Sequence, residues 1–178
     1  MKTFNSITLI FSLQTLLFIV SIPSSHSKTF HPNHQSLITF TCSQTPYPNH
    51  CLQSLKSHLG SDRADMWGLA GIMLNHVMMV KANTALDKIH QLEDAETTPI
   101  QGLVSCYNKY NTILETDIKK ATAAFYNEDS NGAEESANDA AYEVSTCENG
   151  FPGHFTQENK NMLAASANAA AIFKLLRG

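Results

Sequence analysis

The chain has 178 residues, a formal net charge of −4 and 43% hydrophobic residues. A chain of this length fits one domain with a substantial buried core. Its mildly acidic balance, without a cluster of Lys and Arg, excludes the basic surface that binds nucleic acids or anionic lipids, so we expect no nucleic-acid partner.

Residues 1–27 have the pattern of a secretory signal peptide. Lys2 supplies a positive start, an interrupted apolar run covers residues 7–22, and Ser25-His26-Ser27 suggests cleavage after Ser27. The run is too short and too interrupted for a membrane span, which needs about 20 apolar residues. A retained membrane anchor is the minor alternative. We expect a secreted protein in which residues 28–178 form one domain without a membrane contact.

Residues 28–60 predict a short helical hairpin. Leu37, Ile38 and Phe40 precede Cys42, and Pro46-Tyr47-Pro48 then interrupts any helix. A second short apolar set follows around Cys51. Two helices of this length are too small to be stable alone.

Residues 61–178 predict four long helices. Apolar residues recur at steps of three and four in four successive stretches, which begin at Trp67, Leu103, Ala133 and Leu163. This spacing gives each helix one apolar face, which is buried against neighbouring helices. Because the predicted loops are short, neighbouring helices run antiparallel. We predict an all-α fold: an up-down-up-down four-helix bundle preceded by the N-terminal hairpin.

Capping and turn-forming residues mark the predicted helix ends. The predicted caps are Ser61 and Asp62 for the first long helix and Thr156 for the fourth. The predicted breaks after the first, second and third helices are Thr97-Thr98-Pro99, Asp129-Ser130-Asn131-Gly132, and Gly150 with Pro152 and Gly153.

The four cysteines predict two disulfides. An even cysteine count in an exported chain favours disulfides over free thiols. Four cysteines permit three pairings, and the short spacing between Cys42 and Cys51 favours the pairs Cys42–Cys51 and Cys106–Cys147. Crossed pairs and four free buried thiols are the alternatives.

Several segments carry a family resemblance. The stretch from Thr41 to Cys51, the segment from Ser145 to Phe151 and the apolar helix from Asn168 to Leu176 are similar to the plant invertase/pectin methylesterase inhibitor family. Met66–Ala70 stands where that family begins its first long helix. The resemblance implies a four-helix bundle with an N-terminal hairpin, the two disulfides in the order above, and secretion to the cell wall. It also implies inhibition, without catalysis by the chain itself, of pectin methylesterase or an acid invertase through coverage of the active-site cleft.

The loop between the two cysteine-bearing bundle helices bears on the target. In the family's invertase inhibitors this loop typically carries a Pro-Lys-Phe contact, whereas residues 125–132 here lack that tripeptide. Pectin methylesterase inhibitors present polar and acidic groups on the same two helices. We therefore favour pectin methylesterase over a cell-wall or vacuolar acid invertase. A secreted helical carrier of an apolar ligand is the alternative from another class.

The predicted partner-contact residues lie on these two helices and in the loop between them. They are Asn108, Thr112, Glu115, Tyr126, Glu128, Asp129, Thr146 and Asn149. Tyr126 would be an aromatic anchor, or else it packs back beside Phe125. The segment from Glu115 to Glu148 contains nine acids and only two bases, Lys119 and Lys120. These acids would form solvated helix faces or a negative surface that steers a basic partner.

Catalytic and metal-binding motifs are missing from the sequence. It has no Gly-x-Ser-x-Gly, no His-Glu-x-x-His and no phosphate-binding glycine loop. Its histidines show no zinc-like spacing with cysteines that the disulfides leave free. We expect no enzymatic activity, no cofactor, no metal, a protein target as partner, and a monomer in the free state.

Overall fold

A computed structural model describes residues 34–94 and 100–178, which belong to a compact unit that begins at Pro32. The regular structure within these ranges is helical throughout. The predicted signal peptide and the predicted break at residues 97–99 lie outside the described residues. No helix within the described residues is long and apolar enough to cross a membrane.

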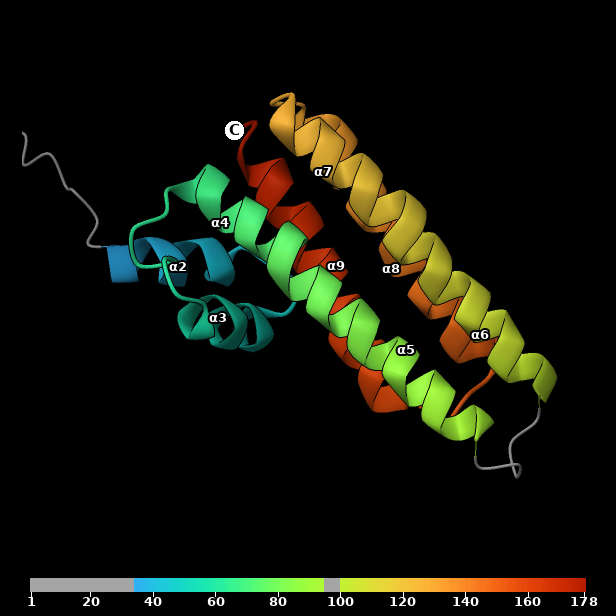
Figure 1. Cartoon of the computed structure of the whole chain (residues 1–178). Helices are drawn as coiled ribbons and strands as arrows, with labels where there is room; N and C mark the ends of the chain where they lie inside the picture. The colour runs from blue at the N-terminus through green and yellow to red at the C-terminus, as the bar shows by residue number, and fades with distance from the viewer. Residues whose placement is uncertain (1–33, 95–99) are drawn as a thin grey trace, which may run out of the picture. The chain divides into compact units, whose positions relative to one another are not determined.

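The described residues form a short helical hairpin and four long helices (Figure 1). The hairpin consists of α2 (His34–Ser43) and α3 (Pro48–Ser57). The first long helix comprises α4 (Met66–Ile72), the π-helical segment η1 (Met73–Met78) and α5 (Met79–Glu93). The second comprises α6 (Ile100–Thr112), the π-helical segment η2 (Ile113–Asp117) and α7 (Ile118–Tyr126). The third is α8 (Ser130–Gly150) and the fourth is α9 (Thr156–Leu175).

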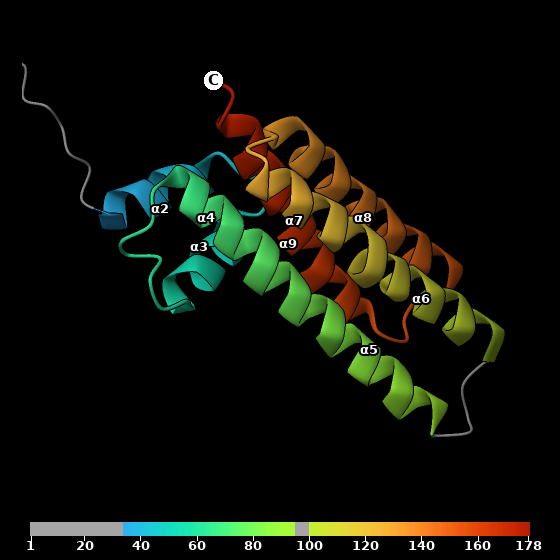
Figure 2. The same cartoon turned by 45° about the horizontal axis from the view of Figure 1, so that its top comes forward.

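The four long helices run alternately up and down, as predicted, and both views show the hairpin beside the α4 end of the bundle (Figures 1 and 2). The predicted apolar stripes are buried: in the first helix, Leu74, Met78, Ala82 and Ala85 have no exposed surface. The α8 and α9 helices pack along each other, and both bury several alanines. Small side chains allow two helix backbones to come close.

The two expected disulfides are present. Cys42–Cys51 joins α2 to α3, and Cys106–Cys147 joins α6 to α8. All four cysteines are buried in the core. The long disulfide therefore ties α6 to α8 through cysteines that lie 41 residues apart in sequence.

Two predicted helix caps are wrong. The first long helix begins at Met66, after Ser61 and Asp62, because the Asp65 carboxylate caps it by accepting a hydrogen bond from the Gly68 amide at 2.7 Å. Thr156 is already the first residue of α9. Its hydroxyl donates instead to Glu148 Oε1 at 2.6 Å. No side chain caps α9, whose N-cap residue is Phe155.

The connection between the second and third helices is shorter than predicted. The α7 helix continues to Tyr126 and α8 begins at Ser130, so only Asn127–Asp129 lie between them. Asp129 caps α8 by accepting from the Gly132 amide at 3.0 Å. Phe125 belongs to the core side of α7, where its ring stacks on Trp67 with ring centroids 5.1 Å apart. The aromatic stack extends the helix into the predicted loop.

Candidate functional site

An open groove of about 500 Å³ lies between the first and second long helices. The first helix contributes Asn75, Met79 and Asn83, and the second contributes Leu114, Glu115, Ile118, Lys119, Thr122, Ala123 and Tyr126. Both π-helical segments contribute to it, η1 through Asn75 and η2 through Leu114 and Glu115. Thr122 Oγ1 donates to Asn75 Oδ1 at 2.6 Å and links the two helices. We call this feature the α5–α7 groove.

Two of the predicted contact residues, Glu115 and Tyr126, line the α5–α7 groove. The Tyr126 side chain is 74% exposed, and its ring meets the Phe125 ring edge to face at 5.5 Å. Met79 lines the opposite side of the groove and is 41% exposed. Glu115 forms an ion pair with Lys119 one turn later on the same helix. The groove thus combines exposed apolar side chains with an ion pair that is neutral as a whole.

The Asn127–Asp129 turn holds two more predicted contact residues. Glu128 has a φ of 57°, in the left-handed region that non-glycine residues rarely adopt. The Asp129 amide donates to the Ala124 carbonyl at 2.9 Å, which keeps the turn compact. Because Asp129 also caps α8, its carboxylate already has a structural role. Glu128 is exposed at the tip of the turn, two residues after Tyr126.

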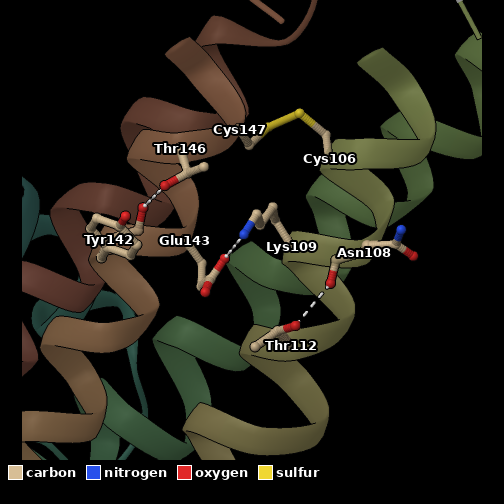
Figure 3. A network of polar contacts seen from close by, with 8 residues as sticks. All are labelled: Cys106, Asn108, Lys109, Thr112, Tyr142, Glu143, Thr146 and Cys147. Carbon is tan, nitrogen blue, oxygen red and sulfur yellow. Dashed lines mark hydrogen bonds and ion pairs between the residues drawn. A yellow bond between two sulfur atoms is a disulfide. The ribbon is translucent and has the colours of Figure 1, made fainter. Parts of the chain in front are cut away.

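Three of the other four predicted contact residues, Asn108, Thr112 and Thr146, lie near the Cys106–Cys147 disulfide (Figure 3). The fourth, Asn149, follows Cys147 by two residues on α8. Asn108 and Asn149 are exposed. Thr112 Oγ1 donates to the Asn108 carbonyl at 3.0 Å, and Thr146 Oγ1 donates to the Tyr142 carbonyl at 2.9 Å. Both threonine hydroxyls are therefore bonded within their own helices.

An ion pair joins α6 to α8 beside this disulfide. Lys109 Nζ lies 2.8 Å from Glu143 Oε2, and the two side chains point toward one another between the helices, whereas Asn108 points away from α8 (Figure 3). The eight predicted residues therefore do not form one surface. Four of them lie in the α5–α7 groove and the adjoining Asn127–Asp129 turn, and the other four are polar residues of α6 and α8 near the disulfide.

Sequence reasoning missed Tyr142, another highly exposed aromatic residue. It lies on α8 and is 69% exposed. Its position off the apolar stripe of α8 could have indicated exposure, because Val144 and Cys147 on that stripe are buried. Its side chain projects from α8 on the side away from α6 (Figure 3).

Most of the acidic run has internal partners. Glu134 forms an ion pair with Arg177, and Glu143 forms one with Lys109. Glu148 accepts hydrogen bonds from Thr156 and Asn159. Since the ion pairs of Glu134 and Glu143 offset two of the negative charges, the negative field available to steer a partner is weaker than the sequence indicates. Among the described ranges, no group of three or more His, Cys, Asp or Glu is placed to hold a metal ion.

Glu148 is the centre of a partly buried polar network that sequence reasoning also missed. Its Oε2 accepts from Asn159 Nδ2 at 2.5 Å, and Asn159 Oδ1 accepts from the Tyr110 hydroxyl at 2.6 Å. Burial alone would raise the pKa of Glu148, but hydrogen bonds from Asn159, Thr156 and the Gly153 backbone outweigh it and lower that pKa. Burial, and then the charges of Glu158 and Glu148, raise the pKa of Tyr110. The network fixes α6, α8 and α9 together beside Cys147.

Comparison with known proteins identifies relatives of the chain. Residues 36–173 match the family described as plant invertase/pectin methylesterase inhibitor. The chain is 32% identical over 140 residues to the Arabidopsis thaliana cell wall / vacuolar inhibitor of fructosidase 1, a match that covers 78% of this chain and 68% of that protein.

Solved structures of Arabidopsis pectin methylesterase inhibitors share the fold. A mutant form A superposes with a TM-score of 0.66 at 18% identity, covering 78% of this chain and 95% of that one. A second inhibitor, from Arabidopsis thaliana, superposes with a TM-score of 0.57 at 19% identity and the same coverage, 78% and 95%. At such low identity these likenesses show the helical-bundle fold alone.

Proposed function

The chain belongs to the plant invertase/pectin methylesterase inhibitor family, a family of enzyme inhibitors rather than enzymes, and we propose that this protein inhibits a plant fructosidase (acid invertase) by covering its active-site cleft. The observation that carries this choice is the 32% identity to the cell wall / vacuolar inhibitor of fructosidase 1 over 78% of the chain. It outweighs the missing Pro-Lys-Phe tripeptide, which had favoured pectin methylesterase, because a match over 140 residues weighs more than three positions.

The proposed contact surface is the α5–α7 groove together with the Asn127–Asp129 turn. Tyr126 is the large exposed aromatic residue beside this turn, and aromatic side chains dominate the energetics of many protein interfaces. Met79 adds a flexible apolar side chain across the groove, a residue type that is enriched at interfaces. Glu128 adds a negative charge at the tip. We propose that these three residues replace the missing tripeptide.

Inhibition of pectin methylesterase is the second candidate function. It is favoured by the polar residues near the disulfide, because the exposed side chains of Asn108, Asn149 and Tyr142 come from two disulfide-linked helices. The two candidate targets therefore correspond to two different surfaces of the bundle. Substitutions can separate them.

We propose that the protein is secreted to the cell wall, with the vacuole as the alternative. The signal-peptide pattern of residues 1–27 supports export, and the name of the fructosidase inhibitor relative includes both compartments. Two disulfides fit an oxidising export route.

The test is inhibition of two purified enzymes by the same preparation. The full chain, secreted from a eukaryotic host and purified, is incubated at pH 5 with a plant acid invertase and, separately, with a pectin methylesterase. We expect saturable loss of invertase activity at unchanged pectin methylesterase activity. Loss of pectin methylesterase activity alone would establish the second candidate instead, and loss of neither would reject both.

A further inference from the structure

Asp117 is a buried carboxylate between the second and third long helices. It ends the π-helical segment η2, its side chain is 4% exposed, and its Oδ2 has no hydrogen-bond partner within the described residues. A buried ionised carboxylate without partners is costly to keep in a folded protein. Most buried acids avoid this cost through an ion pair or several hydrogen bonds.

Helical spacing explains why an acid faces inward here. Asp117 follows Ile113 by four residues and precedes Ala121 by four, and both of these residues are buried. Asp117 also directly precedes the buried Ile118. The carboxyl therefore lies on the buried face of its helix.

The charges around Asp117 are unfavourable as a set. Within the described residues, the charged groups that act on its carboxyl are Asp139 and Glu143 of α8 and Lys120 of α7. The α5 helix, which also packs against η2, contributes none of these groups. Glu143 is partly neutralised by Lys109. Two negative charges and one positive charge thus act on the Asp117 carboxyl, whose ionised form is already disfavoured by burial.

We propose that Asp117 makes the packing between the second long helix and α8 sensitive to pH. This packing is most stable when the Asp117 carboxyl is protonated in acid, and it becomes less stable when the carboxyl ionises near neutral pH. The Asn127–Asp129 turn connects the same two helices. The inference concerns the fold itself and does not depend on the identity of the target enzyme.

The direction of the effect follows from proton linkage. Burial first, and then the charges of Asp139 and Glu143, raise the pKa of Asp117 from 3.8 to about 6. Between these values the folded chain binds more protons than the unfolded chain, so stability falls as pH rises through this window. For this one group, the unfolding equilibrium constant increases about tenfold between pH 5 and pH 7.

The test compares chemical unfolding of the purified secreted protein at pH 5 and pH 7 with that of Asp117→Asn. Asn keeps the shape of the side chain without its charge. Histidines and other acids titrate equally in both proteins, so the difference between the two pH dependences isolates Asp117. We expect the variant to lack the tenfold change and to be more stable than the wild type at pH 7. Glu135→Gln removes an exposed acid of α8 that does not act on Asp117, and it is expected to retain the wild-type pH dependence.

A second measurement does not require a folded variant. The carboxyl carbon of Asp117 in the wild-type protein can be titrated by NMR, and we expect a midpoint near pH 6. A midpoint near 4, or parallel pH dependences for the wild type and Asp117→Asn, would overturn the proposal.

Discussion

The side chain of Asn168 binds both backbone polar groups of Tyr47. Its Oδ1 accepts from the Tyr47 amide at 3.0 Å, and its Nδ2 donates to the Tyr47 carbonyl at 3.1 Å. Asn168 is fully buried on α9, and Tyr47 lies in the turn between α2 and α3, 121 residues earlier. One side chain of the last helix therefore fixes the hairpin turn that the Cys42–Cys51 disulfide closes.

Replacing Asn168 with Ala removes both hydrogen bonds and leaves the Tyr47 amide without this partner, whereas the Tyr47 carbonyl still accepts from the Cys51 amide at 3.0 Å. We expect a loss of roughly 1–3 kcal/mol in the free energy of unfolding, measured by chemical denaturation. Hydrogen exchange should accelerate first in α2 and α3. Asn161→Ala, a substitution on the same helix at a less buried asparagine, is the control and should cost under about 0.5 kcal/mol. Equal effects of the two substitutions would contradict the assigned role of Asn168.

Glu148→Gln tests the polar network around Glu148. The substitution removes the negative charge and replaces one of the two carboxylate oxygens that accept from Asn159 and Thr156 with an N–H donor. We expect a loss of about 1–3 kcal/mol at pH 7, measured by chemical denaturation.

The pH dependence of this loss has a definite sign. Because the pKa of Glu148 is lowered in the folded protein, its stabilising effect is complete above the ordinary value of 4.5 and is lost as pH falls through the folded pKa. The difference between wild type and variant should therefore shrink in strong acid. A difference that grows on acidification would show that Glu148 does not act as the ionised acceptor.

Glu128→Gly separates backbone strain from a contact role. Glycine adopts the φ of 57° freely, so we expect stability to increase by about 1 kcal/mol. If Glu128 contacts the target, Glu128→Gly should inhibit more weakly even though the variant is more stable. Glu128→Ala, which removes the carboxylate but keeps the strain, should weaken inhibition without the gain in stability. A variant that is more stable and inhibits equally well would remove Glu128 from the contact surface.

Gly71→Ala tests the packing that supports Tyr126. A Cβ at position 71 would lie 2.7 Å from Cζ of Phe125, within the stack of Trp67 and Phe125. We expect destabilisation of about 1–3 kcal/mol, measured as a lower denaturation midpoint. Gly150→Ala is the matched control, because a Cβ there meets no atom within 4 Å. In a helix it should be neutral or slightly stabilising, and a cost similar to that of Gly71→Ala would contradict the packing argument.

The fold could be predicted from sequence because its causes are periodic and local. The apolar stripes containing Leu74 and Ala137 identify helices and their buried faces. The two π-helical segments could not be predicted, because neither contains a proline or another residue that marks a π turn. Both segments contribute residues to the α5–α7 groove.

The candidate site was less predictable than the fold. Tyr126 and Glu115 were among the predicted contact residues, but the groove that brings them together with Met79 depends on packing between two helices. Similarly, Glu148 was counted as one charge in an acidic run, and its partner Asn159 lies on another helix. Contacts between helices leave no signal in the spacing of one chain segment.

The most direct test of the central claim is the inhibition constant for a plant acid invertase, measured for the wild type, Tyr126→Ala and Tyr142→Ala. Both tyrosines are highly exposed, so neither substitution should affect folding. We predict that the wild type inhibits the invertase and that Tyr142→Ala has little effect on the inhibition constant. Tyr126→Ala should weaken inhibition at least tenfold, as expected for loss of an interface anchor worth about 2 kcal/mol. Inhibition that Tyr142→Ala abolishes and Tyr126→Ala leaves unchanged would contradict the proposed contact surface, and a wild type that does not inhibit invertase would contradict the proposed function.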